Sequence, residues 1–147
     1  MSSENRYQRG NDEYATPDWL RKGLFEGWFD PCPLSLGLVL RDGLCCEWNS
    51  RNSRRVFVNP PYSNPLPWVE KAIDESERGL TVALLLKHDS STRWWAKLHQ
   101  AKAHFLPVMG RINFGGGKPA PFPSVIAVLY SEKTEQRNRG IEGLGDE

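Results

Sequence analysis

Hydrophobic positions along the middle of the chain follow two different periods. Residues 80–86 are apolar on both faces, which is typical of a buried central strand. Residues 67–78 and 89–104 instead carry apolar side chains three or four positions apart, as helices with one buried face do. Residues 16–18 (Thr-Pro-Asp) are typical of a further helix start. The remaining strands are expected at residues 28–30, 56–58, 105–108 and 124–130.

Strand and helix patterns alternate along the chain. This order predicts an α/β fold, with a mostly parallel sheet connected by crossover helices and an antiparallel edge formed by the last strands. One folded domain is expected over residues 12–130. Residues 1–11 and 131–147 are polar and poor in large apolar side chains, so both ends are predicted to be disordered.

Composition restricts the function classes that are open to the chain. The 147 residues carry a formal net charge of +1, which excludes a polycationic coat for nucleic acid. Residues 81–120 nevertheless hold six basic residues against Asp89 alone, a local net charge of +5. No apolar run is long enough for a membrane span, and the polar N-terminus predicts a cytoplasmic protein. The histidines and cysteines do not show the spacing of a metal site, so no metal is expected.

The most informative segment follows the strand at residues 56–58 and consists of Asn59, Pro60, Pro61 and Tyr62. Ligands of open α/β sheets bind outside the carboxyl ends of the strands. Two prolines fix the backbone there, so the Asn59 side-chain oxygen and the Pro60 carbonyl can both accept hydrogens from one amino group. Tyr62 adds a ring that can stack on a planar base. The segment predicts methyl transfer to an amino nitrogen; the alternative interpretation is a turn that ends a strand.

Nine segments of the folded region, Asn59–Tyr62 among them, together resemble the family of phage-type DNA N-6-adenine methyltransferases. The resemblance implies a reduced Rossmann-like fold, S-adenosylmethionine as cofactor and an adenine in DNA as the methyl acceptor. The matching segments, in order, are residues 14–17 (YATP), 29–33 (FDPCP), 42–44 (DGL) with Trp48, 56–63 (VFVNPPYS), Trp68 with residues 71–72, 81–86, 91–95 (STRWW), 110–114 (GRINF) and 120–124 (APFPS).

The resemblance also implies roles for single residues. Residues 59–62 correspond to the catalytic loop. Thr16 and Pro17 look like the segment that contacts the methionine end of the cofactor, and Asp30 with Pro31 looks like the acidic turn that faces its charged amino group. Asp42 looks like the residue that lines the cofactor's adenine. The chain departs from most methyltransferases of this fold after Asp30, where a proline-rich stretch replaces the usual glycine-rich turn.

The basic stretch supplies the expected DNA contacts. Lys87 and His88 follow the buried strand, so they are predicted to lie beside the catalytic loop and to meet a phosphate and the target base. Arg93 and Arg111 are expected to hold phosphates or to recognise bases. Lys118 follows three glycines in a loop that can contact DNA. The alternative for these side chains is an ordinary solvated loop.

Two other functions fit the same residues. The motif also suits an RNA base or a protein glutamine amide as methyl acceptor, and the short region between Asp30 and Asn59 suits a non-catalytic nucleic-acid-binding remnant of the fold. The chain shows no separate domain for target recognition. Specificity is therefore expected to come from its loops or from the second copy in a homodimer.

Overall fold

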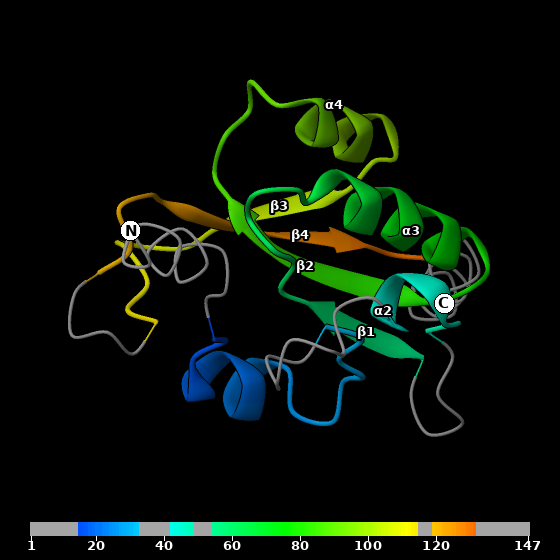
Figure 1. Cartoon of the computed structure of the whole chain (residues 1–147), viewed down its shortest axis with the longest axis horizontal. Coiled ribbons are helices and arrows are strands. Elements are labelled where there is room, and N and C mark those ends of the chain that lie inside the picture. Colours follow the sequence, from blue (N-terminus) through cyan, green and yellow to red (C-terminus); the bar gives the residue numbers. More distant parts are fainter. Residues whose placement is uncertain (1–14, 33–41, 49–53, 115–118, 132–147) are drawn as a thin grey trace, which may run out of the picture.

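The computed structural model describes residues 15–32, 42–48, 54–114 and 119–131. In this part of the chain, a four-stranded sheet has α3 and α4 on one face and the helical segment η1 on the other (Figure 1). The elements are η1 (Trp19–Leu24), α2 (Asp42–Cys45), β1 (Arg55–Val58), α3 (Leu66–Glu77), β2 (Thr81–Lys87), α4 (Arg93–Gln100), β3 (His104–Pro107) and β4 (Ser124–Leu129).

The strand order β1-β2-β4-β3 corrects the expected topology. β1 and β2 are parallel, but β4 runs antiparallel to both β2 and β3. Two of the three strand pairs are therefore antiparallel, and the prediction of a mostly parallel sheet was wrong. The reversed strand is also internal instead of lying at the edge. The reason is burial: every residue of β4 is buried, whereas β3 exposes three of its four residues and includes Pro107, which suits an edge strand.

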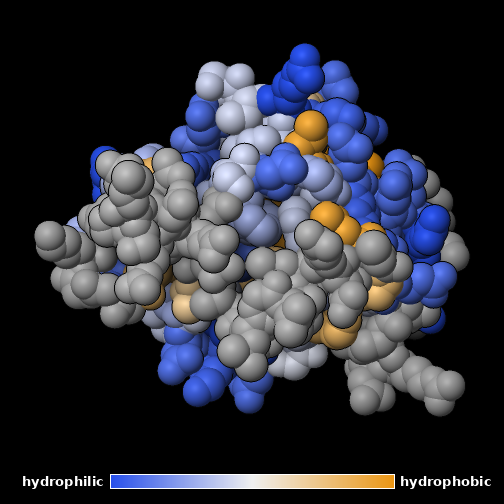
Figure 2. All heavy atoms as spheres, viewed as in Figure 1, coloured by the Kyte–Doolittle hydropathy of each residue, from blue (hydrophilic) through white to orange (hydrophobic). Residues whose placement is uncertain are grey.

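The core has two layers because β2 is apolar on both faces, as its sequence predicted. Val82, Leu84 and Leu86 pack toward α3 and α4, where Trp68 and Leu98 are among the buried partners. Ala83 and Leu85 pack on the other face, against a cluster that includes Leu20 of η1, Phe25 and Phe57. On the side of the molecule shown in Figure 2, hydrophilic side chains cover much of the region of α3 and α4.

Both ends of α4 differ from the expectation of a helix over residues 89–104. The helix begins after Thr92, whose Oγ1 accepts the backbone N–H of Trp95 at 3.3 Å. Asp89 cannot serve as the cap because its carboxylate accepts the backbone N–H and the hydroxyl of Ser91 in a turn before the helix. The helix ends at Gln100 with Ala101 as its C-cap, and Lys102 then adopts a positive φ of 61°.

Within the described ranges, no helix is long and apolar enough to cross a membrane. The termini that the sequence predicts to be disordered, residues 1–11 and 132–147, lie outside those ranges. Ser131, which the prediction assigned to the C-terminal tail, is buried.

Candidate active site

The strand register brings several of the predicted site residues to one edge of the sheet, called the carboxyl edge below. β1 ends at Val58, paired with Leu84, and β2 continues to Lys87, paired with Ser124 at the start of β4. Phe29 forms an isolated parallel bridge with Val56. The residues that follow Phe29, β1 and β2 therefore leave the sheet on the same side.

The side chain of Asn59 is held by a residue from a distant part of the chain, the segment before η1. Its side-chain Nδ2 donates a hydrogen bond of 3.1 Å to Thr16 Oγ1. An amide held through its nitrogen turns its oxygen elsewhere, and here Asn59 Oδ1 is shielded from solvent. Thr16 was expected both to cap the first helix and to contact a cofactor. The capping position is instead occupied by Asp18, without a side-chain hydrogen bond. The Thr16 hydroxyl accepts the hydrogen bond from Asn59.

Tyr62 belongs to an aromatic cluster with Phe114 and Phe122. Its ring centroid lies 6.3 Å from that of Phe114 and 5.1 Å from that of Phe122, both in edge-to-face geometry. The ammonium of Lys87 lies 4.8 Å from the ring centroid of Phe122 and 5.8 Å from that of Tyr62, close enough for a cation–π interaction. Lys87, the last residue of β2, thus lies against Tyr62 of the Asn59–Tyr62 loop, as expected from its position at the end of the buried strand. The two phenylalanines were missed because the segment 110–123 has no regular period.

Asp30 is an acid in a partly desolvated position. Burial raises the pKa of its carboxyl group, although the backbone N–H of Cys32 (2.9 Å) and the guanidinium of Arg21 (3.0 Å) act in the opposite direction. Because the pKa is raised overall, these two donors do not fully compensate the carboxylate for the water that burial removes. A bound ammonium group would offset more of it, so Asp30 fits the amino end of an S-adenosylmethionine molecule.

Pro31, the residue after Asp30, is in close contact with Gly43 of α2. A Cβ atom on Gly43 would collide with the carbonyl oxygen of Pro31 and would lie 2.7 Å from Trp68 Cη2. The Gly43 carbonyl also accepts the indole N–H of Trp48 at 2.7 Å, in a buried hydrogen bond. Asp42 is the first residue of α2, but its side chain lies outside the described parts.

His88 is exposed, but its ring is not isolated. It lies parallel to the ring of Trp95, with 5.3 Å between centroids and an interplanar angle of 2°. Trp95 in turn stacks with Phe105 at 4.2 Å and 11°. The backbone N–H of His88 donates to the Pro123 carbonyl at 2.9 Å, which holds the residue at the carboxyl edge. Trp94 is buried in the core.

The other predicted DNA contacts fall into two groups. Arg93, in the first turn of α4, and Arg111, four residues after β3, are both exposed on segments that begin at the carboxyl edge. Lys118 lies outside the described residues. Arg54 and Arg55 are exposed at the amino end of β1, the opposite end of that strand from Asn59.

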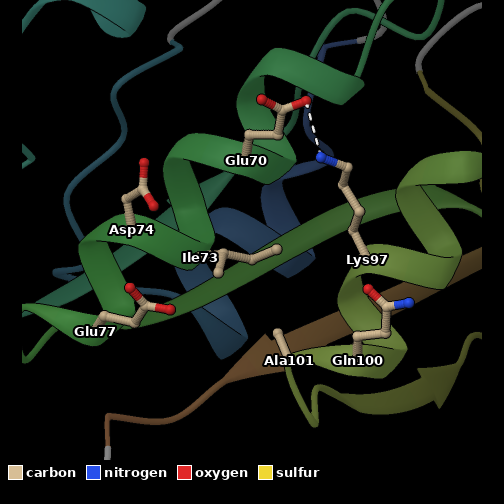
Figure 3. Close-up of a pocket in the computed structure, with 7 residues that line it drawn as sticks. All are labelled: Glu70, Ile73, Asp74, Glu77, Lys97, Gln100 and Ala101. Carbon is tan, nitrogen blue, oxygen red and sulfur yellow. Dashed lines mark hydrogen bonds and ion pairs between the residues drawn. The ribbon is translucent and has the colours of Figure 1, made fainter.

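A cavity of about 400 Å³ lies elsewhere, between α3 and α4 (Figure 3). Three acidic residues of α3 are among those that line it, and Glu70 forms an ion pair with Lys97 at 3.4 Å. None of the predicted site residues lines it, and its acidic wall does not suit DNA. The lining residues are Glu70, Ile73, Asp74, Glu77, Lys97, Gln100 and Ala101. Across the described ranges, no group of three or more His, Cys, Asp or Glu side chains could hold a metal ion.

Comparison with known proteins identifies the family. A model of the DNA N-6-adenine-methyltransferase (Dam) family matches residues 39–142, which is more than two thirds of the chain. The chain belongs to this family. The matched region contains Asn59, Tyr62 and Lys87, whereas Thr16 and Asp30 precede it. The family resemblance expected from the sequence is therefore confirmed.

Two curated relatives carry the same description. A DNA N-6-adenine-methyltransferase of Haemophilus phage HP1 is 33% identical over 105 residues, covering 65% of this chain and 61% of the relative. One of Escherichia phage T1 is 37% identical over 60 residues, covering 41% of this chain and 25% of the relative. The chain thus spans less than two thirds of the length of either relative. No solved structure matches it.

Proposed function

We propose that the protein is a site-specific DNA methyltransferase that transfers a methyl group from S-adenosylmethionine to N6 of adenine. One observation carries the proposal: the Asn59–Tyr62 loop lies at the carboxyl edge, inside the region that the family model matches, with Asn59 fixed by Thr16. The names of the phage relatives support DNA adenine as the acceptor.

The fold fits a reduced Rossmann-like methyltransferase. β1, β2 and β3 run in the same direction, and α3 and α4 connect them across one face of the sheet. The parallel bridge at Phe29 adds a further position beside β1. Among the strands that the structure describes, β4, between β2 and β3, runs opposite to the other three.

The target amino group is bound by two acceptors in this proposal. With Nδ2 held by Thr16, the Oδ1 atom of Asn59 is the part of the amide that accepts one hydrogen, and the Pro60 carbonyl accepts the other. Holding both hydrogens frees the nitrogen lone pair for attack. Tyr62 stacks on the base. Since Asn59 Oδ1 is shielded from solvent, binding of the target requires a local movement around the loop.

The cofactor would be held on the η1 side of the loop. When bound, S-adenosylmethionine supplies a methyl group on a positively charged sulfur. Asp30 with Pro31 would face its ammonium group, Thr16 and Pro17 would contact its methionine end, and Asp42 would line its adenine. The acceptor nitrogen gains the methyl group and releases one proton, while the electron pair of the broken carbon–sulfur bond stays on sulfur.

DNA would approach the carboxyl edge, where Lys87, His88, Arg93 and Arg111 lie on segments that end or begin there. Lys118, outside the described residues, stays a predicted DNA contact. An adenine paired in a duplex cannot reach Asn59, so it has to leave the base stack. DNA and the cofactor occur together in the cytoplasm, which is the proposed compartment. The second copy of a homodimer stays a prediction from the sequence.

The test is to incubate the protein with S-adenosylmethionine labelled in its methyl group and, separately, with DNA, RNA and a glutamine-containing protein. The proposal expects label in DNA, recovered as N6-methyladenine after digestion to nucleosides. Label found only in RNA or only in protein would show that adenine in DNA is not the methyl acceptor. DNA binding without any transfer would support a non-catalytic remnant.

A further inference from the structure

Residues Met109, Gly110 and Arg111 form an exposed tip at the carboxyl edge. β3 ends at Pro107, and the backbone N–H of Val108 still donates to the Ser124 carbonyl at 3.0 Å. The next three residues are exposed, and Gly110 has a positive φ of 70° that favours glycine at this bend.

The tip is firmly anchored on the side that leads to the catalytic loop. Ile112 is 2% exposed within the core layer beside η1, and its carbonyl accepts the backbone N–H of Ala120 at 2.8 Å. Two residues further on, the ring of Phe114 meets the ring of Tyr62. The segment therefore joins the end of β3 to the predicted base-binding ring, and only its tip projects into solvent.

Met109 stands out in this tip because it is a large apolar side chain that is almost fully exposed to solvent. Its exposed fraction is 95%, the highest among the large apolar side chains that the structure exposes, which include Leu24 at 64% and Leu106 at 54%. An apolar side chain in water gains by entering an apolar environment. Arg111, two residues later in the chain, is an exposed cation on the same tip. An apolar tip next to a cation matches the two parts of a nucleic acid, its stacked bases and its phosphates.

We infer that Met109 is a wedge that enters the base stack of duplex DNA beside the target adenine and occupies the space that the extruded base leaves. The flexible, unbranched methionine side chain suits an irregular apolar gap, and methionine is among the side chains that proteins insert between base steps. Arg111 holds the neighbouring phosphate. This inference rests on the proposed function, because it concerns how the adenine reaches the Asn59–Tyr62 loop.

If Met109 is a wedge, its substitution should affect methyl transfer to duplex DNA more than methyl transfer to single-stranded DNA. A single strand needs no partner base to be separated, whereas extrusion from a duplex costs unpairing and unstacking energy. Met109→Ala is therefore expected to lower kcat/KM on a duplex about tenfold or more and to change it less than about twofold on the same single strand. Leu106→Ala removes an exposed apolar side chain three residues earlier and is expected to leave both values unchanged.

A second readout does not need methyl transfer. A duplex with the fluorescent base 2-aminopurine at the target position brightens when that base leaves the stack. The wild type and the Leu106→Ala variant are expected to raise this fluorescence on binding, and Met109→Ala is expected to raise it much less. Equal loss of activity on both substrates, an unchanged duplex activity, or full fluorescence with Met109→Ala would each overturn the wedge. Absence of transfer to either DNA by the wild type would instead refute the proposed function, while the fluorescence still tests Met109.

Discussion

Nδ2 of Asn59 donates a hydrogen bond of 3.1 Å to Oγ1 of Thr16, a residue 43 positions earlier in the chain. The bond links the segment before η1 to the loop that follows β1, so it joins the proposed cofactor segment to the proposed catalytic loop. Because the bond holds the amide through its nitrogen, it fixes the orientation of the Asn59 oxygen, the proposed acceptor of a hydrogen from the target.

Replacing Thr16 by valine removes this hydroxyl at nearly constant volume. A single hydrogen bond contributes about 0.5–1.5 kcal/mol, so Thr16→Val should lower kcat/KM for methyl transfer by roughly three- to tenfold. Thr16→Ser keeps the hydroxyl and should retain most of the activity. Steady-state kinetics with DNA measures both variants. Equal activity of the valine and serine variants would show that Thr16 does not position Asn59.

Asp30 should make stability depend on pH. Burial raises its pKa in the folded protein, so between the ordinary aspartate pKa and the raised value the folded state binds more protons than the unfolded state. The free energy of unfolding of the wild type should therefore fall as the pH rises through this window, relative to Asp30→Asn. Urea unfolding at a series of pH values measures the difference.

Two controls connect this pH dependence to the cofactor. Asp74→Asn, an exposed position on α3, keeps the Asp30 carboxyl group and should follow the wild type. Saturating S-adenosylmethionine should reduce the fall in the wild type, because its ammonium favours the charged carboxylate. Parallel curves for the wild type and Asp30→Asn would contradict a carboxyl group whose pKa is raised by burial.

Gly43 should not tolerate a side chain. A Cβ atom at this position would lie 2.7 Å from Trp68 Cη2 and would collide with the Pro31 carbonyl. Overpacking of this kind costs about 1–3 kcal/mol, so Gly43→Ala should lower the free energy of unfolding by that amount and should raise KM for the cofactor by displacing Pro31. Gly23→Ala is the matched control, because nothing lies within 4 Å of its Cβ position. Equal stability of the two variants would refute the close contact.

Arg93 and Arg111 should contribute to the salt dependence of DNA binding. Each phosphate contact adds about 0.9 to the slope of log K against log salt concentration, so the double alanine variant should lose about two units of slope. Arg54 and Arg78 are exposed arginines at the amino end of β1 and the end of α3, away from the carboxyl edge. Their double alanine variant should keep the wild-type slope. An identical slope in both double variants would exclude the carboxyl edge as the DNA surface.

The positions of four strands could be predicted because apolar runs identify them directly. The strand expected at residues 28–30 was wrong: Phe29 forms only a single-residue bridge there. Residues 80–86 were expected as a buried strand, and β2 extends over Thr81–Lys87. Strand order could not be read in this way. It depends on how completely each strand is buried by its neighbours, and the difference between β3 and β4 became visible only from the exposure of single residues.

The local sequence also does not show contacts between distant segments. The pattern at residues 16–18 predicted a helix cap, because capping depends on neighbours in sequence, whereas the hydroxyl of Thr16 accepts a hydrogen bond from Asn59. Phe114 and Phe122 come from an irregular segment, and only the fold brings them to Tyr62. The roles of the catalytic, cofactor and DNA residues stay predictions.

Methyl transfer to DNA by Asn59→Ala, compared with Asn64→Ala, tests the central claim most directly. Asn64 is an exposed asparagine five residues further along the same connection and serves as the matched control. The account predicts that Asn59→Ala loses nearly all transfer of labelled methyl groups while it still folds and binds DNA, and that Asn64→Ala retains the wild-type rate. Retention of substantial transfer to adenine by a folded Asn59→Ala protein would contradict it.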